Sequence, residues 1–318
     1  MTSAGDPAAS VVRAVFGEQA RVSSAARLPG GASRETWSLD VRADGVTHEL
    51  VLRMDGPGAV LETGAGSGLA AEARLMRAAA ETGVPVPRIV AEGTAERPYL
   101  LMTRVDGETI PRKILRDPEF AGARESLTEQ CGAALAAIHR MPVTAVAEAA
   151  PPDPLRQWRD VLDLTGQPHP AFELAFRRLD ETRPDPGGVA VVHGDFRNGN
   201  LIVGPEGLRA VLDWELAHVG DPIEDLGWLC VKAWRFGAPR PVGGFGDYDT
   251  LVAAYEKAGG RRVDPAALRW WETFGVLKWG VICVMQAMRH LEGGARSVEL
   301  AAIGRRVCET EWDLLNLL

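Results

Sequence analysis

Residues 189–225 read VAVVHGDFRNGNLIVGPEGLRAVLDWELAHVGDPIED, and in them short apolar runs alternate with polar turns. The apolar runs at 189–192, 201–203 and 208–212 predict three short strands, and the Gly-Pro-Glu-Gly turn between the last two predicts a β-hairpin. A hairpin folds the end of its second strand back towards the start of its first. Three oxygen-bearing side chains are therefore expected to converge at one end of a rigid scaffold: Asp195, Asn200 and Asp213.

Two carboxylates and one amide oxygen suit a hard cation such as Mg²⁺, which usually keeps water or phosphate oxygens in its other positions. Phosphoryl transfer needs such an ion to neutralise phosphate charge. It also needs one further carboxylate that orients the attacking hydroxyl group. The stretch therefore indicates a site for phosphoryl transfer.

Two motifs in this stretch carry a family resemblance: His193-Gly194-Asp195 with Asn200, and Val211-Leu212-Asp213-Trp214-Glu215. They look like the core of the aminoglycoside phosphotransferase (choline kinase-like) family of small-molecule kinases. The Asp-x-x-x-x-Asn spacing is also that of the protein-kinase catalytic loop. The resemblance implies an α+β, bilobal protein kinase-like fold. Its N-terminal nucleotide-binding lobe, built on a small antiparallel sheet, would cover residues 1–103. Its mostly helical C-terminal lobe, with the catalytic loop and the acceptor site, would cover residues 104–318.

The resemblance also implies a role for each polar residue of the loop. Asp195 would accept or orient the proton of the substrate hydroxyl, and Asn200 and Asp213 would hold Mg²⁺. His193 would brace the loop through hydrogen bonds. Arg197 would stabilise charge on the transferred group; an exposed loop arginine without chemistry is the alternative.

A Gly-rich segment, LPGGASRETW, precedes the first predicted hairpin of the chain. Alternating apolar residues at 37–41 predict one strand, Asp44-Gly45 a turn, and residues 48–54 the return strand. Glycine lets backbone amides approach a phosphate closely because it has no Cβ. In the family resemblance this segment is the nucleotide loop, with Gly31 at the phosphates and Ser33 as the side-chain contact, although a G-x-G-x-x-G pattern is missing.

Kinases normally place a lysine on the return strand to hold the nucleotide phosphates, and this chain has Arg53 there. Arginine is a permanent cation with a planar fork, so it can bind phosphate with a different geometry. Glu72, in the first turn of a helix predicted at 70–80, matches the carboxylate that pairs with this cation. The alternatives are a surface arginine and a glutamate that simply favours a helix N-terminus.

The last strand predicted for the first lobe covers residues 98–103 and leads into a turn. In the resemblance this is the hinge between the lobes, where Met102, Thr103 and Val105 face the adenine. A turn that merely ends a sheet strand is the alternative.

Helical spacing dominates the rest of the chain, which predicts helices at 124–139, 153–164, 170–179, 223–234, 248–258, 265–289 and 297–317. His139 is predicted to end a helix rather than to bind a ligand. The Asp221-Pro222 pair fits a helix cap better than a metal-hydrolase site. The aromatic residues of 265–289 are predicted to be mostly core, with some available to an acceptor pocket.

The net charge of −8 argues against a general nucleic-acid binder. No signal-peptide pattern and no membrane-spanning run are present, and the four cysteines have no metal or CxxC spacing. We therefore expect buried, reduced cysteines in a cytoplasmic protein, a monomer or homodimer, with no nucleic-acid or membrane partner.

The sequence thus predicts a Mg²⁺-dependent kinase that transfers the γ-phosphoryl group of ATP or GTP to a hydroxyl group of a small molecule. The details LPGGASRETW, VLRMD and HGDFRNGN look nearest to the branch associated with acyl-CoA dehydrogenases. That suggests a hydroxy acid or hydroxyacyl thioester as acceptor rather than an aminoglycoside. The alternative is a nucleotide- or ligand-binding pseudokinase, which Arg53 favours and the joint presence of Asp195, Asn200 and Asp213 disfavours. A metal-dependent hydrolase comes third.

Overall fold

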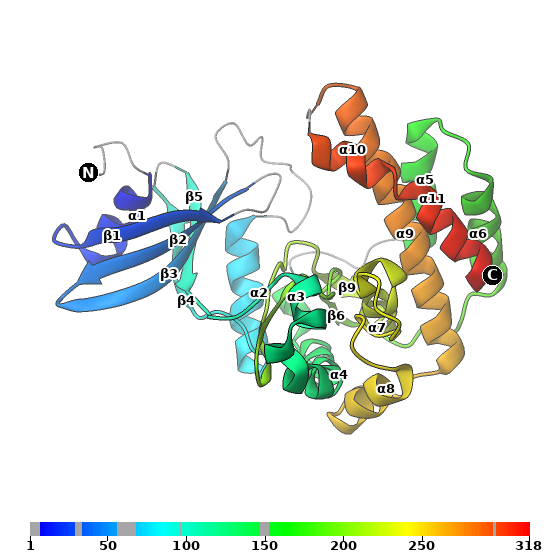
Figure 1. Cartoon of the computed structure of the whole chain (residues 1–318), viewed down its shortest axis with the longest axis horizontal. Helices are drawn as coiled ribbons and strands as arrows, with labels where there is room; N and C mark the ends of the chain where they lie inside the picture. The colour runs from blue at the N-terminus through cyan, green and yellow to red at the C-terminus, as the bar shows by residue number, and fades with distance from the viewer. Residues whose placement is uncertain (1–6, 29–33, 56–67, 96, 147–152, 295–296) are drawn as a thin grey trace.

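The computed structural model describes residues 7–28, 34–55, 68–95, 97–146, 153–294 and 297–318. An antiparallel sheet from the N-terminal third lies on one side, and the C-terminal helices form a larger body on the other (Figure 1). The short strands of residues 190–220 lie within the helical body.

The sheet has five strands in the order β1-β2-β3-β5-β4, and every neighbouring pair is antiparallel. These are β1 (Arg21–Leu28), β2 (Arg34–Ala43), β3 (Val46–Asp55), β4 (Ile89–Thr94) and β5 (Pro98–Thr103). The predicted turn between β2 and β3 is confirmed, since Asp44 and Gly45 have φ of 51° and 77°, as a two-residue hairpin turn requires. Strand β1 was not predicted, because it is exposed along most of its length and has no apolar alternation.

The two faces of the sheet pack against different helices. Leu50 and Leu52 of β3 are buried together with α1 (Pro7–Phe16). Arg53 therefore lies on the opposite face, towards α2 (Leu69–Glu81), as the period of a strand dictates. Period-two alternation predicts Val51 and Arg53 on one face of β3 and Leu50 and Leu52 on the other, and the burial of Leu50 and Leu52 confirms it. For α2, helical spacing predicts Leu69, Met76 and Ala80 on one buried face, but the buried residue near the C-terminal end is Ala79 and Ala80 is exposed.

The predicted catalytic hairpin is confirmed as β7 (Leu201–Gly204) and β8 (Gly207–Val211), which pair antiparallel with Leu201 opposite Val211. Beyond the paired strands the Leu212 N–H still donates to the Asn200 carbonyl oxygen at 2.8 Å. The strand β6 (Ala190–Val192) pairs with β9 (His218–Gly220), and β9 is too short to have been predicted.

The remaining helices are α3 (Pro111–Arg116), α4 (Ala121–Ile138), α5 (Pro154–Thr165), α6 (Pro170–Glu181), α7 (Ile223–Cys230), α8 (Tyr248–Lys257), α9 (Pro265–Leu291), α10 (Val298–Gly304) and α11 (Val307–Leu317). Three 3-10 turns join them: η1 (Pro118–Phe120), η2 (Val143–Ala145) and η3 (Lys232–Arg235). Helix α9 is central, since α5, α6, α7, α10 and α11 all pack on it. Trp270, Trp271 and Phe274 are buried in the core, which confirms the core interpretation for them. No helix within the described ranges is both long enough and apolar enough to cross a membrane.

Three predictions about the C-terminal part were wrong. The helix predicted at 223–234 ends at Cys230, because Val231 is extended and the Leu229 carbonyl accepts a hydrogen bond from the Gly243 N–H at 3.1 Å. The helix predicted at 297–317 is split between α10 and α11, and each piece packs separately on α9. Cys308 is exposed, whereas Cys131, Cys230 and Cys283 are buried as expected.

Candidate active site

The carboxylate of Asp195 is held by three donors, one from α7 and two from its own loop. The Trp228 indole Nε1–H donates to Oδ1 at 2.8 Å, and the Asn200 amide donates to Oδ2 at 2.6 Å. Arg197 Nε lies 3.0 and 3.2 Å from the two oxygens. The side chain remains 13% exposed. An oriented carboxylate with partial access is what a residue needs in order to accept or direct a hydroxyl proton.

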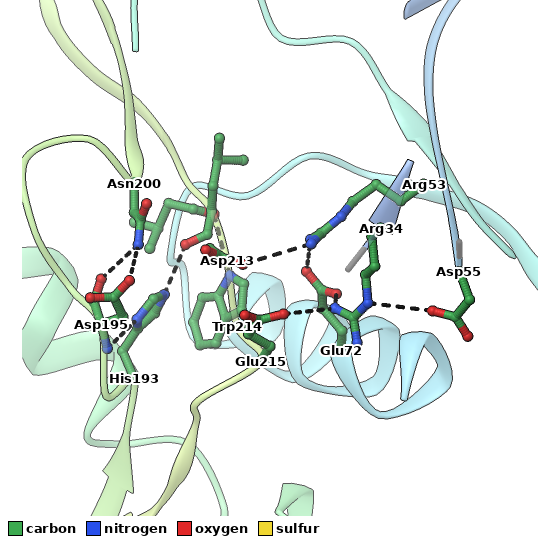
Figure 2. A network of polar contacts seen from close by, with 12 residues as sticks. Arg34, Arg53, Asp55, Glu72, His193, Asp195, Asn200, Asp213, Trp214 and Glu215 are labelled. Atoms are coloured by element: carbon green, nitrogen blue, oxygen red, sulfur yellow. Dashed lines mark hydrogen bonds and ion pairs between the residues drawn. The ribbon is translucent and has the colours of Figure 1, made fainter. Parts of the chain in front are cut away.

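His193 is fully buried under this loop and is hydrogen-bonded on both ring nitrogens. Its Nε2 is 3.1 Å from the Leu212 carbonyl oxygen, and the Asp195 N–H donates to its Nδ1 at 3.3 Å (Figure 2). Burial lowers the pKa of His193 in spite of the nearby Asp225, Asp195 and Asp213. A neutral ring that donates at Nε2 and accepts at Nδ1 satisfies both contacts, as expected of a residue that braces the loop.

Asp225 anchors the same loop from α7. Its carboxylate accepts the backbone N–H groups of His193 at 2.8 Å and Gly194 at 2.9 Å, and His139 Nε2 lies 3.1 Å away. Burial opposes ionisation, but His139 and the backbone donor outweigh it, so the pKa of Asp225 is lowered. His139 does end α4 as predicted, yet it also contacts Asp225 and the Tyr255 hydroxyl, at 2.8 Å. The sequence carried no sign of this link.

Asp221 caps α7, as predicted. Its Oδ1 accepts the Ile223 N–H at 2.9 Å, and its Oδ2 accepts the Gly187 N–H at 2.6 Å. One carboxylate thus fixes both the helix start and the segment that leads into β6. The capping interpretation therefore accounts for this residue.

Arg197 is a quarter exposed and lies over the Trp234 ring at 4.7 Å. Its contacts with Asp195 show that it is not merely an exposed loop arginine. The guanidinium carries a permanent positive charge beside the carboxylate that would face the hydroxyl group.

Lys278 of α9 contacts the loop that carries Asp195, and the sequence analysis did not identify it. Its buried Nζ lies 3.4 Å from the Gly194 carbonyl oxygen, 3.3 Å from Glu224 Oε1 and 4.7 Å from the Trp228 ring centroid. In the sequence it only interrupts an apolar run. Lysine is rarely buried without a partner, so a lysine inside an apolar helical run was the one sequence signal for this contact.

Asn200 and Asp213 fit the donor chemistry of Mg²⁺. The Asn200 side-chain N–H groups donate to Asp195, to its backbone carbonyl oxygen at 3.0 Å and to its carboxylate. The amide oxygen of Asn200 is therefore the atom left to bind a metal. Asp213 is 35% exposed and has φ of 67°, a left-handed conformation that aspartate tolerates better than most residues. No group of three or more His, Cys, Asp or Glu side chains that could enclose a metal occurs in the described part of the chain. One carboxylate and one amide suit an ion that takes its other ligands from water and phosphate.

At the sheet, the expected pair of Arg53 and Glu72 is confirmed as a contact (Figure 2). Arg53 also lies 3.7 Å from Asp213, which joins the sheet to the catalytic hairpin. Glu72 is 2% exposed and is shared with a second guanidinium, that of Arg34, at 3.1 Å. Burial raises the pKa of Glu72, although Arg53 and Arg34 oppose that rise.

Gly31 and Ser33 lie outside the described residues. Met102 pairs within the sheet with Val51 and Ile89, and the Thr103 N–H donates to the Arg88 carbonyl oxygen at 2.9 Å. Among the described residues, Val105 makes no backbone hydrogen bond with another residue. Val105 is therefore the expected hinge residue whose backbone groups remain available to a base.

Two surface hollows, of about 660 and 430 Å³, lie between α5 and α6 and between α8 and α9. Neither is lined by a residue predicted for catalysis, metal or nucleotide. The loop residues and the sheet residues described above form a separate site.

The sequence model of the phosphotransferase enzyme family matches residues 24–271. The chain belongs to this family. The predicted resemblance is therefore confirmed over most of the chain, including most of the sheet, the catalytic hairpin and the start of α9.

Among curated relatives of this phosphotransferase-family chain, acyl-CoA dehydrogenase family member 10 of Mus musculus is 30% identical over 220 residues, 64% of this chain and 20% of that protein. Viomycin phosphotransferase of Streptomyces vinaceus is 30% identical over 186 residues, 53% of this chain and 63% of that protein. The chain thus spans less than two thirds of either relative.

Solved structures agree on the fold. A putative aminoglycoside phosphotransferase from Ralstonia eutropha superposes with a TM-score of 0.73 at 22% identity and 96% coverage of both chains. Aminoglycoside phosphotransferase APH(4)-Ia, in a ternary complex with ADP and hygromycin B, gives 0.63 at 18% identity, again with 96% of both chains. The expected protein kinase-like fold, with an antiparallel sheet and a mostly helical remainder, is confirmed.

Proposed function

We propose that this chain is a small-molecule kinase that transfers the γ-phosphoryl group of ATP or GTP to a hydroxyl group. One observation carries the proposal. Asp195 is hydrogen-bonded to Asn200, the hairpin returns the chain to Asp213, and Asp213 contacts Arg53 of the sheet. A base, a metal-ligand pair and a phosphate cation thus follow one another in the order that phosphoryl transfer requires.

In this proposal Asp195 orients the acceptor hydroxyl and accepts its proton on one of the two carboxylate oxygens. Trp228 and Asn200 keep the carboxylate in one orientation, which lowers the entropy cost of reaching a reactive geometry. Arg197 supplies positive charge where the transferred group passes. A magnesium ion held by Asn200 and Asp213 would neutralise charge on the nucleotide phosphates.

The nucleotide would lie against the sheet. Arg53, oriented by Glu72, would hold phosphates, with Gly31 and Ser33 as further phosphate contacts. Met102, Thr103 and Val105 would border the adenine. This division assigns residues 1–103 to the nucleotide and residues 104–318 to catalysis and acceptor binding. A cytoplasmic location and a monomeric or homodimeric state belong to the same proposal.

The acceptor is proposed to be a hydroxy acid or a hydroxyacyl thioester. The sequence relation to acyl-CoA dehydrogenase family member 10 supports this class. Arg197, a quarter exposed beside Asp195, supports it as well, because a cation at that place disfavours a polycationic antibiotic. The relation to viomycin phosphotransferase makes antibiotics the main competitors, and they belong in the same assay.

A pseudokinase that binds nucleotide without turnover is the second candidate. One observation favours it: Arg53 already contacts Asp213, the carboxylate that would hold the metal. In turnover the nucleotide phosphates and the metal would compete with this contact.

The test combines binding with transfer. Thermal stabilisation by ATP or GTP with Mg²⁺ is expected, and its absence would count against both candidates. Phosphate transfer is then measured on a panel of hydroxy acids, hydroxyacyl-CoAs, choline, homoserine and aminoglycosides. Asp195→Ala should lower turnover by about 10²–10⁴-fold and leave nucleotide affinity nearly unchanged. Binding without transfer to any acceptor selects the pseudokinase.

A further inference from the structure

Arg34, the first residue of β2, lies in the LPGGASRETW segment but had no predicted role there, and its guanidinium is largely shielded from water. Its side chain is 9% exposed. Nη1 lies 3.1 Å from Glu72 Oε2 and 3.1 Å from Glu215 Oε2, and Nε lies 3.5 Å from Asp55 (Figure 2). One cation therefore joins the sheet, α2 and the segment that follows β8.

Arg34 and Arg53 form two parallel connections to that segment. In the β2–β3 register Arg34 opposes Asp55 and Thr36 opposes Arg53, so both guanidiniums lie on the same face of the sheet. Arg53 contacts Asp213 at 3.7 Å, and Arg34 contacts Glu215 two residues later. The carboxylate of Glu72 lies between the two guanidiniums and binds both.

The two connections differ in what nucleotide binding demands of them. In the proposed function Arg53 also binds phosphate and Asp213 also binds the metal, so both ligands compete with their mutual 3.7 Å contact and weaken it. The proposed function gives neither Arg34 nor Glu215 a role in binding phosphate or metal. Their ion pair is partly shielded from water, which makes it less subject to screening than a pair on the open surface.

Resting on that proposed function, we propose that Arg34 is a positioning residue for the metal-bound nucleotide: through Glu215 and Glu72 it keeps the Asp213-Trp214-Glu215 segment on the sheet when the contact between Arg53 and Asp213 weakens. Arg34 then controls where the metal ligand stands relative to the phosphates. A purely structural arginine would affect folding stability alone, and the metal dependence of nucleotide affinity separates the two roles.

The experiment compares Arg34→Met, Glu215→Gln and the double variant by calorimetric titration with ATP, once with Mg²⁺ and once with EDTA. Each single change is expected to weaken Mg²⁺–ATP binding about tenfold, while metal-free ATP changes about twofold or less. The double variant should be no weaker than the worse single variant, because both changes remove the same connection.

The matched control is another ion pair of the same region, Arg77 of α2 with Glu92 of β4, whose atoms lie 2.8 Å apart. It lies outside the network around Glu72, so Arg77→Met and Glu92→Gln should leave Mg²⁺–ATP affinity unchanged. If Arg34→Met does not fold, Glu215→Gln carries the test, because its side chain is 39% exposed.

A second readout is independent of nucleotide. Hydrogen exchange at the amides of residues 213–216 should be faster in Arg34→Met than in Arg77→Met. If the wild type binds no nucleotide, the proposed function is wrong. The exchange rates then still decide whether Arg34 holds the Asp213-Trp214-Glu215 segment on the sheet. A wild type that binds, with Arg34→Met variants that bind Mg²⁺–ATP equally well or show unaltered exchange, overturns the inference alone.

Discussion

The indole of Trp228 donates a hydrogen bond to Oδ1 of Asp195 at 2.8 Å, across 33 positions of sequence. The donor comes from α7, the helix that also supplies Asp225 to the backbone of the same loop. The carboxylate and its loop are thus oriented from one rigid element. This arrangement makes the reactivity of Asp195 depend on residues that do not touch a substrate.

Trp228→Phe keeps an aromatic ring and removes the donor. We expect turnover to fall about 10- to 100-fold with little change in nucleotide affinity, because a hydrogen bond to a charged group contributes about 1.5–3 kcal/mol. Steady-state kinetics measure this. Trp270→Phe is the control, since that indole donates to the Leu179 carbonyl oxygen in the core at 2.8 Å. Equal losses of turnover in the two variants would show that Trp228 acts only through folding.

Lys278→Met removes a buried cation from Glu224 and leaves His218, at 3.2 Å, as the remaining ion-pair partner of that carboxylate. The free energy of unfolding should fall by about 3–5 kcal/mol, the usual result of removing one partner of a buried ion pair. Adding Glu224→Gln should recover part of the loss. Urea unfolding of the single and the double variant measures both free energies. A Lys278→Met variant as stable as the wild type would show that the Lys278–Glu224 pair does not stabilise the fold.

His193 should stay neutral at a lower pH than an ordinary imidazole does. Burial lowers the pKa of His193 below its usual 6.5. The stability gained from the neutral ring is therefore present above about pH 6.5 and is lost as the pH falls through the folded-state pKa. The pKa of His218 is shifted the opposite way: burial opposes a rise, but Glu224 outweighs it. Nitrogen-15 NMR of the ring at about pH 6.5, where an ordinary imidazole is half charged, should find His193 mostly uncharged, and a ring that is half charged or more there would contradict the prediction.

Gly194→Ala should disrupt the catalytic loop. Gly194 has φ of 80°, and an added Cβ would collide with the Leu216 carbonyl oxygen. Gly166 is the matched control, because its φ of 63° is also positive but the space around it is open. Gly166→Ala should lose only the backbone term, about 1–2 kcal/mol. Gly194→Ala should lose more stability and most of its turnover, as melting curves and kinetics would show; similar melting points would argue against the collision.

The catalytic hairpin was predictable because its information is local. Strand patterning and a Gly/Pro turn are enough to return residue 213 to residue 200, and the pairing of Leu201 with Val211 follows. Arg53 and Glu72 were also paired correctly, from the position of each in its own element. Local patterns failed where packing ended a helix early, as at Val231.

The supports of the site were not predictable from the same patterns. His139, Asp225 and Lys278 reach the loop from α4, α7 and α9. In sequence each resembles an ordinary cap, acid or surface lysine. Their burial and partners exist only after the helices have packed.

The sequence by itself determined the kinase-like order of the loop, the hairpin and the two residues predicted to hold a metal, because neighbours in the chain decide turns and strand register. Only the tertiary structure decided that Arg34 shares Glu72 with Arg53 and that Trp228 orients Asp195. The physical reason is that a buried charge or donor takes the partner that packing brings within about 3 Å, and sequence spacing does not encode that distance.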